Sequence, residues 1–174
     1  MGYKTTQFLG VARINNTTQH QNIQEHTKKM ISHGLSDEEL QCIEEQLVEA
    51  RSRAYCPYSK FHVGCVLFVR GTQDPYICGC NVENASFGAT ICAERVAMLK
   101  AMSNGCQERW TVLAIIGDTS GPSDKVITPC GMCRQVMNEF IKDRETFPIL
   151  MYSPDLKKLQ VTNLNELMPM PFNL

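Results

Sequence analysis

The 174-residue sequence lacks any apolar run approaching the roughly 18 residues that a membrane-spanning helix needs. It also lacks, at its N-terminus, the charged and then apolar pattern of a secretory signal peptide. An excess of basic residues is missing too, because 17 Lys and Arg face 18 Asp and Glu, for a formal net charge of -1. These absences argue against a membrane protein, a secreted protein and a protein that grips a phosphate backbone. A small neutral ligand fits this charge balance better than a nucleic acid does.

Cysteine, by contrast, is plentiful, with nine residues. In a chain without a signal peptide, cysteines are more often thiols and metal ligands than partners in disulfides. Apolar residues make up 43% and charged residues 20% of the chain, which is ordinary for a globular domain. We therefore expect a protein of a reducing compartment, the cytoplasm, that carries thiols available to a metal.

The chain divides into an N-terminal extension, residues 1–34, and one domain, residues 35–174. The extension is rich in Asn, Thr and Gln and has little to bury, which is typical of a flexible tail. Its basic residues, opposed by the single acid Glu25, also fit a mitochondrial presequence, and Gly2 with Thr6 matches a short myristoylation pattern. A plain disordered tail is the preferred interpretation.

Helix and strand patterns alternate along the domain. Ser36 followed by Glu39 is a capping-box pattern, after which apolar residues recur at helical spacing as far as Ala50. Runs rich in β-branched and aromatic residues predict a hairpin over 61–71 and 76–82. The other expected elements are a buried helix over 92–105, a central strand over 111–117, a helix from Pro129 or Cys130, strands over 147–153 and 158–163, and a short helix over 163–168. This alternation predicts an α/β fold with a mixed sheet covered by helices.

Three cysteines are placed as a set of metal ligands. Cys130 and Cys133 lie at i and i+3 at the start of one expected helix, and Cys92 opens another. Helix N-termini favour thiolate over thiol, and thiolates suit zinc. Because the apolar residues of the later helix continue the same face, we expect both of its sulfurs to point toward the core. The arrangement predicts three thiolates around one zinc ion.

Each part of this pattern also has a simpler interpretation. The sequence CGMC at 130–133 fits a redox pair, half of a structural zinc site or two buried cysteines. Cys78 or Cys80 would supply a fourth sulfur and close the site into a non-catalytic zinc module. Glu94 argues against closure, because a structural site gains nothing from a carboxylate two residues after a ligand. Beside a zinc ion with an open fourth position, that carboxylate accepts a proton from water, which predicts a hydrolytic centre.

The motifs CAE at 92–94 and PCGMC at 129–133 match the signature of zinc deaminases. With YCPYSKFHVG, CNVENASFG and CAERVAMLKAMSNG, the chain resembles the cytidine deaminase family, in its small homotetrameric branch, over about residues 36–172. The resemblance implies a three-layer α/β/α sandwich with a mixed five-stranded sheet. It further implies one zinc ion per subunit, sites at the subunit interfaces of a homotetramer, and hydrolysis of cytidine and deoxycytidine to uridine and deoxyuridine with release of ammonia.

The resemblance also assigns roles near the metal. Cys92, Cys130 and Cys133 correspond to the zinc ligands, and Glu94 to the group that carries protons to ring N3 and to the leaving amino group. Three thiolates and one zinc ion have a net charge of -1, which Arg95 would offset by donating hydrogen bonds to the sulfurs. The sequence leaves Arg134 either sharing that task or solvated.

Other residues correspond to groups that hold the nucleoside. The resemblance implies that Asn81 and Glu83 bind the ribose hydroxyls and that Phe61 packs near the substrate. It implies that the backbone of Ala93 contacts the pyrimidine edge. Two aromatic residues remain: Phe87 lies in the 81–87 loop at subunit contacts, where many relatives carry Tyr, and Phe172 matches an aromatic that reaches a neighbouring subunit's site, with a frayed terminal residue as the alternative.

Three other functions compete with this one. A polynucleotide cytidine deaminase of the same fold would favour a basic surface, which this near-neutral chain lacks. A blasticidin S deaminase is opposed by Phe61 and by the sequence NVEN at 81–84. A non-catalytic zinc module remains the alternative from a different functional class. The expected partner is a small nucleoside, with neither nucleic acid nor membrane.

Overall fold

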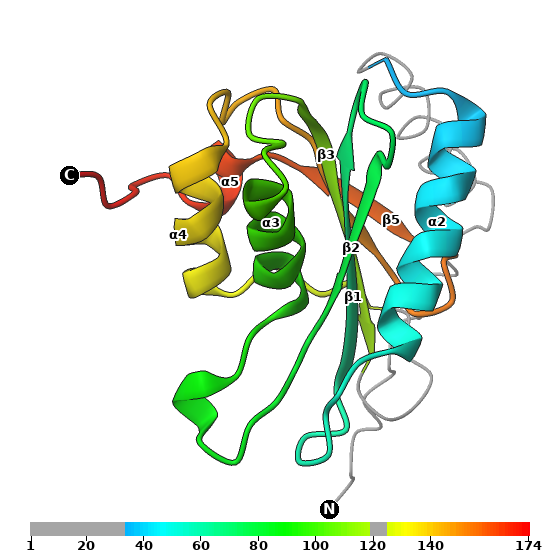
Figure 1. The fold of residues 1–174 in the computed structure, drawn as a ribbon, viewed down its shortest axis with the longest axis vertical. Helices are drawn as coiled ribbons and strands as arrows, with labels where there is room; N and C mark the ends of the chain where they lie inside the picture. The colour runs from blue at the N-terminus through cyan, green and yellow to red at the C-terminus, as the bar shows by residue number, and fades with distance from the viewer. Residues whose placement is uncertain (1–33, 119–124) are drawn as a thin grey trace, which may run out of the picture.

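The computed structural model describes residues 34–118 and 125–174. The expectations for the extension up to residue 33, including targeting and myristoylation, lie outside the described residues. Every helix and strand that the sequence predicts in the described part is present (Figure 1). The elements in chain order are α2 (Asp37–Ser52), β1 (His62–Val69), β2 (Tyr76–Cys80), the 3₁₀ turn η1 (Phe87–Ala89), α3 (Ala93–Ser103), β3 (Trp110–Asp118), α4 (Gly131–Phe140), β4 (Ile149–Tyr152), β5 (Leu159–Thr162) and α5 (Leu164–Leu167).

The five strands form one mixed sheet in the order β2-β1-β3-β4-β5. β1 pairs antiparallel with both β2 and β3, and β4 pairs antiparallel with β5. Among the neighbouring pairs of this sheet, β3 and β4 form the parallel one, and the chain between them contains α4. A parallel pair needs such a crossover, whereas the antiparallel neighbours β1 and β2 are joined by a short turn. The predicted mixed five-stranded sheet is confirmed.

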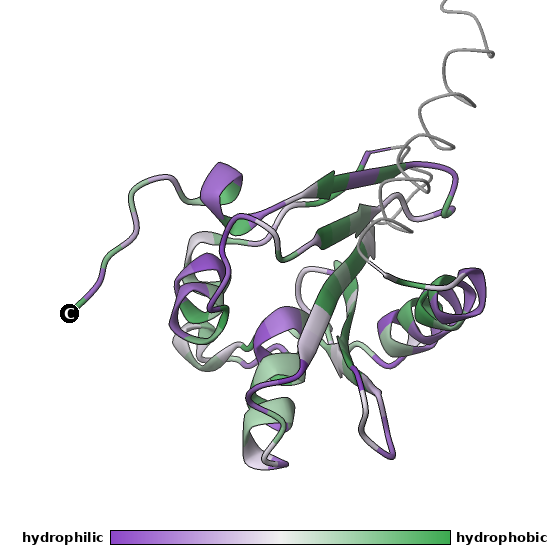
Figure 2. Cartoon of the chain, turned by 90° about the horizontal axis from the view of Figure 1, so that it is seen from above, coloured by the Kyte–Doolittle hydropathy of each residue, from purple (hydrophilic) through white to green (hydrophobic). Residues whose placement is uncertain are grey.

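The sheet lies between two layers of helices. Val63, Cys65 and Leu67 of β1 pack with α3 and α4 on one face, and the alternating residues Val66 and Phe68 pack with α2 on the other. Figure 1 shows α2 on one side of the sheet and α3, α4 and α5 on the opposite side. In Figure 2 the strands are largely hydrophobic, while α2 presents a hydrophilic outer face. The predicted three-layer sandwich is confirmed.

Local signals place the helix ends. The Ser36 hydroxyl accepts from the backbone N–H of Glu39 at 3.2 Å, and the Glu39 carboxylate accepts from the backbone N–H of Ser36 at 2.8 Å, so the capping box is confirmed. α3 ends before Gly105, whose φ of 73° is the left-handed conformation that a glycine allows at a helix end. The helix expected to be buried is buried on one face only, because Ala97, Met98 and Ala101 are fully buried while Leu99 is 50% exposed. Within the described residues, no helix is long and apolar enough to cross a membrane.

Candidate active site

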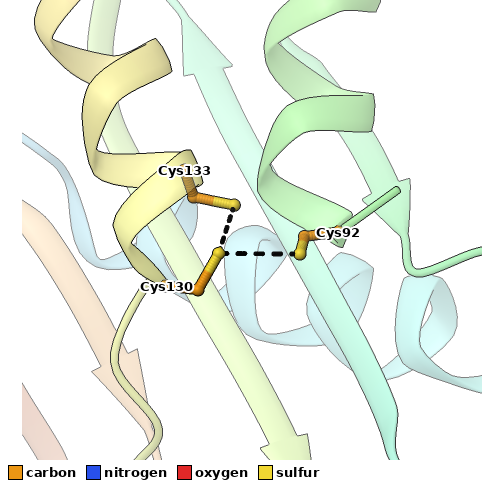
Figure 3. Close-up of side chains that lie close together, drawn as sticks. All are labelled: Cys92, Cys130 and Cys133. Carbon is orange, nitrogen blue, oxygen red and sulfur yellow. Dashed lines mark hydrogen bonds between the residues drawn. The ribbon is translucent and has the colours of Figure 1, made fainter. Parts of the chain in front are cut away.

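Two helices begin next to each other on the same face of the sheet. Cys92 is the N-cap of α3 and Cys130 is the N-cap of α4. Both residues have extended backbone, and neither sulfur caps its helix in the described structure. The two side chains, together with that of Cys133 in the first turn of α4, point toward one another (Figure 3). The free N–H groups and dipoles of both helix ends favour negative charge at this point.

The sulfur spacing suits a metal ion. The Sγ atoms of Cys92 and Cys130 are 3.8 Å apart and those of Cys130 and Cys133 are 3.5 Å apart, and all three lie within 4.8 Å of one another. A disulfide would bring two sulfurs to about 2.05 Å. Tetrahedral zinc, with Zn–S bonds of about 2.3 Å, holds its sulfurs about 3.8 Å apart. The three thiols therefore fit the donor set and the spacing of a zinc site.

The three ligand candidates differ in exposure. Cys133, on the inner face of α4, is buried in the core, whereas Cys92 is half-buried and Cys130 is exposed. The expectation that both sulfurs of α4 point into the core is therefore correct for Cys133 and wrong for Cys130. Cys130 precedes the first helical residue, so the apolar face of the helix does not set its direction. The cluster consequently has one side in the core and one side open to solvent.

Proton sharing and a nearby cation favour negative charge on Cys92. A hydrogen bond with Cys133, and a second contribution from Arg95, lower the pKa of Cys92 to about 5. The same bond with Cys92, together with burial, raises the pKa of Cys133 well above its usual range. The pKa values of these two thiols are therefore shifted in opposite directions. A metal that binds all three sulfurs as thiolates displaces any remaining thiol proton, so binding is coupled to proton release.

Arg95 lies beside the cluster. Its Nη2 is 3.8 Å from the Sγ of Cys92 and donates to the carbonyl oxygen of Thr90 at 3.1 Å. Its Nε is buried without a hydrogen-bond partner among the described residues, so one donor is left over beside the sulfurs. A spare buried donor fits a site that gains negative charge when further thiols ionise. The sequence prediction that Arg95 offsets thiolate charge is consistent with this geometry at Cys92.

Glu94 is a buried carboxyl group next to the sulfurs. It lies in the first turn of α3 and is 5% exposed. Burial raises the pKa of Glu94, and the negative charge of Cys92 raises it further. A carboxyl group with a raised pKa holds its proton more readily than a solvated one, which suits a group that takes up and returns protons.

Gly79 allows α3 to approach the sheet closely. A Cβ atom built on Gly79 would lie 2.6 Å from the backbone nitrogen of Ala97, and closer still to the carbonyl oxygen of Ala93. Both contacts are with backbone, which cannot rotate out of the way. The start of α3, with Cys92 and Glu94, is therefore seated directly on β2. Sequence reasoning missed this residue, although an isolated glycine within a strand is itself a sign of close backbone approach.

We expect Gly79→Ala to lower both stability and activity. The clash with α3 should cost about 3 kcal/mol of unfolding free energy, and a 1 Å displacement of α3 should reduce turnover about 100-fold. The control is Gly64→Ala, whose Cβ would lie 2.6 Å from the backbone nitrogen of Arg51 in α2, on the other face. Urea unfolding and turnover at permissive temperature separate the two effects. Equal losses of activity in both variants would contradict this account.

Cys78 and Cys80 lie away from the cluster. Cys78 packs against the α2 side of the sheet, where its Sγ donates to Oε1 of Gln46 at 3.3 Å. The Sγ of Cys80 donates to the backbone oxygen of Arg53 at 3.4 Å. Cys133 packs in the core on the opposite face. Among the described residues, the sulfurs that could hold a metal are those of Cys92, Cys130 and Cys133, so the structure gives no support to a closed four-sulfur site.

Comparison with known proteins agrees with this geometry. Residues 37–147 match the family model described as the cytidine and deoxycytidylate deaminase zinc-binding region. The chain belongs to this family. It is 41% identical over 126 residues to a cytidine deaminase from Sporosarcina psychrophila, covering 72% of this chain and 85% of that one. The crystal structure of a cytidine deaminase from Burkholderia pseudomallei superposes with a TM-score of 0.66 at 36% identity, covering 79% of this chain and all of that one. A blasticidin-S deaminase from Bacillus cereus is less similar, at 30% identity over 117 residues, which cover 66% of this chain and 79% of that one.

In this deaminase family member, Asn81 and Glu83 organise the chain around β1. The amide oxygen of Asn81 accepts from the backbone N–H of Val63 at 2.8 Å, and its amide nitrogen donates to the backbone oxygen of Phe61 at 2.8 Å. The Glu83 carboxylate accepts from the backbone N–H of Tyr58 at 2.9 Å, and the hydroxyl of Ser59 donates to it as well. The hydrogen bond from Ser59 is the main cause that lowers the pKa of Glu83. The pair thus fixes the segment that carries Phe61.

The aromatic residues singled out in the sequence lie in three settings. Phe61 is partly buried against the same core cluster as Cys92. Phe87 is 74% exposed, and its ring meets that of Tyr58 edge-on at 6.0 Å between centroids. Phe172 is 65% exposed, but its backbone oxygen accepts from Gln135 of α4 at 3.0 Å. The tail is therefore tied to α4 while the Phe172 ring points outward, which argues against a frayed end.

Arg134 differs from both sequence expectations. Its guanidinium is part-buried and donates to the backbone oxygens of Pro129 and Leu167. It is thus neither solvated nor shown in contact with a sulfur. The sequence carried no signal for these partners, because Leu167 is 33 residues away along the chain.

Proposed function

We propose that this protein is a zinc-dependent cytidine deaminase, which hydrolyses cytidine and deoxycytidine to uridine and deoxyuridine with release of ammonia. The observation that carries this function is the buried carboxylate of Glu94 beside three sulfurs spaced for a single metal ion. A structural zinc site gains nothing from such a carboxylate. A hydrolytic site requires one, because protons must move between water, ring and leaving group.

The residues of the site divide the reaction between them. Cys92, Cys130 and Cys133 would hold one zinc ion per subunit, which supplies a Lewis acid that acidifies water. Glu94 accepts the proton of that water and delivers it to ring N3, so that C4 becomes electrophilic. After water oxygen has added to C4, Glu94 relays the second proton to the amino group, which leaves as ammonia. Arg95 draws charge from the thiolates and keeps the metal an effective Lewis acid.

Recognition of a nucleoside is proposed for the segment around β1. Asn81 and Glu83 would bind the ribose hydroxyls, Phe61 would pack against the substrate and the backbone of Ala93 would meet the pyrimidine edge. This selects a ribose-bearing ligand over blasticidin S. The net charge of -1 provides no basic surface for a polynucleotide, so we propose no nucleic-acid or membrane partner.

The test is the ultraviolet absorbance of cytidine mixed with purified protein, with metal analysis and an ammonia assay in parallel. We expect loss of the cytidine band, stoichiometric ammonia and one zinc per subunit, and we expect a chelator to stop the reaction. Blasticidin S and a cytosine-containing single-stranded oligonucleotide serve as competing substrates. Zinc without turnover of cytidine, or faster turnover of either competitor, would refute the proposed substrate, and turnover without zinc would refute the mechanism.

We further propose a homotetramer in which each site is completed by a neighbouring subunit. Five apolar side chains of neighbouring segments are exposed: Tyr55, Tyr58, Val82, Phe87 and Ile91. Backbone bridges join Val82 to Tyr55 and to Ile91, and the ring of Tyr58 contacts that of Phe87. Exposed apolar side chains gathered in this way favour a protein interface, and a second copy of this chain is the proposed occupant.

We expect Phe172→Ala to raise KM for cytidine about tenfold while kcat stays nearly unchanged. The reason is that the ring, held outward by α4, would contact the substrate of a neighbouring subunit, and losing one buried aromatic contact costs more than 1 kcal/mol. Met170→Ala, which changes an exposed residue of the same tail, is the control. Steady-state kinetics with light scattering measures both affinity and assembly. An unchanged KM in an intact tetramer would contradict this role.

The cellular setting is proposed from the sequence. We place the enzyme in the cytoplasm, where uridine formation contributes to pyrimidine salvage. Residues 1–34 are proposed to be an N-terminal extension outside the catalytic domain. Imaging of full-length protein and of a chain starting at residue 35 tests both, since a mitochondrial signal present only in the full-length protein would overturn the cytoplasmic assignment.

A further inference from the structure

Arg134 joins two segments that are far apart in the sequence. Its Nε donates to the backbone oxygen of Pro129 at 2.8 Å and its Nη2 donates to the hydroxyl of Thr128 at 3.3 Å. Its Nη1 donates to the backbone oxygen of Leu167, the last residue of α5, at 2.6 Å. One planar cation therefore binds the residues immediately before Cys130 and the end of a different helix. Arg is suited to this task because its donors are held in a fixed fork.

Cys130 is the ligand candidate that most needs such support. It is exposed, and residues 125–130 form no regular secondary structure before α4 begins. Cys133, by comparison, is held by the helix and by the surrounding core. The direction of the Cys130 sulfur therefore depends on how residues 128–129 are held. Arg134 holds both of them from one side chain.

The end of α5 is a suitable anchor. Arg144 donates to the backbone oxygen of Met168, next to Leu167, and its own backbone oxygen accepts from the N–H groups of Leu164 at 3.0 Å and of Asn165 at 3.2 Å. Leu164 is fully buried. These contacts fix the end of α5 without involving residues 128–130, which we call the metal loop. Arg134 therefore ties the metal loop to a fixed point of the fold.

We infer that Arg134 is a positioning residue for the metal site, which sets the direction of the Cys130 sulfur by fastening residues 128–129 to the end of α5. This inference rests on the zinc site of the proposed function and is independent of the substrate. Groups that orient metal ligands from outside the ligand set change metal affinity by about 10- to 100-fold when they are replaced. Arg134→Gln removes the cation and the fork, so we expect a loss of zinc affinity in that range.

The experiment uses full-length, zinc-loaded protein and two matched variants. Arg134→Gln and Arg144→Gln each remove a guanidinium that binds a carbonyl at the end of α5, but only the first touches the metal loop. Zinc affinity is measured by competition with a chromogenic chelator. Cobalt-substituted protein reports the ligand geometry through its thiolate-to-metal charge-transfer and d–d bands. We expect Arg134→Gln to lower zinc affinity 10- to 100-fold and to shift the cobalt bands, and Arg144→Gln to leave both as in the unaltered protein.

Two further variants cover the case in which Arg134→Gln does not fold. Arg134→Lys keeps the charge but not the fork, and Thr128→Val removes one acceptor, so both should lower zinc affinity by less than Arg134→Gln would. Unaltered affinity and cobalt spectra in the folded Arg134 variants would overturn the inference, as would an equal loss in Arg144→Gln. A zinc-loaded wild-type protein that does not deaminate cytidine would contradict the proposed function alone, because the metal measurements do not depend on turnover.

Discussion

Replacing Glu94 by glutamine should leave a folded, zinc-loaded protein that turns over cytidine on the order of 10⁴-fold more slowly. Glutamine has nearly the shape of glutamate but cannot accept and return a proton. The side chain is buried at the start of α3, so a neighbouring carboxylate cannot readily take its place. Because Glu94 would act on both ring N3 and the leaving amino group, its loss affects two proton transfers in one reaction. Steady-state kinetics, zinc analysis and thermal unfolding together measure the effect.

The matched control for this variant is Glu44→Gln. Glu44 is also a helical glutamate, and burial raises its pKa, but it lies in α2 on the opposite side of the sheet. The same chemical change there should leave turnover within a factor of about two. Full activity of Glu94→Gln would remove Glu94 from the mechanism. Loss of zinc from that variant would instead assign the carboxylate to metal binding.

The fold was predictable from the sequence because its signals are local. The capping box at Ser36 and the glycine at 105 mark helix ends through contacts within a few residues. Continuous apolar runs mark strands that are covered on both faces, as β3 and β4 are here. The number of layers and of strands came from resemblance to the deaminase family. The order β2-β1-β3-β4-β5 was not predicted, because pairing partners leave no local trace in the sequence.

The candidate site was predictable in its composition but not in its orientation. The sequence pattern predicted that Cys92, Cys130 and Cys133 lie at the starts of two helices. In the structure their sulfurs lie within 4.8 Å of one another. Cys130 was expected to point into the core but is exposed. It precedes the first residue of α4, so its side chain does not have to lie on the apolar face of that helix. The partners of Arg134 depend on where α5 lies, which only the tertiary structure determines.

Cys133→Ala should abolish zinc binding and, with it, cytidine turnover. Two remaining sulfurs, one of them exposed, do not make a complete zinc site, which requires three protein ligands when the fourth position is left for water. The cost to the apoprotein should be small, about 1 kcal/mol, as is usual for a single core substitution. Metal content after dialysis, turnover and apoprotein unfolding test these three expectations separately.

Cys65→Ala is the control that separates a lost ligand from a lost core atom. Cys65 and Cys133 are both fully buried in the same apolar cluster, and each substitution removes one sulfur from it. Cys65 lies in β1, so its replacement should cost similar stability and leave zinc and turnover intact. If both variants lost zinc equally, the loss would come from disturbed core packing around the helix starts. The result would then give no support to Cys133 as a ligand. If neither lost zinc, a different set of ligands would have to be sought.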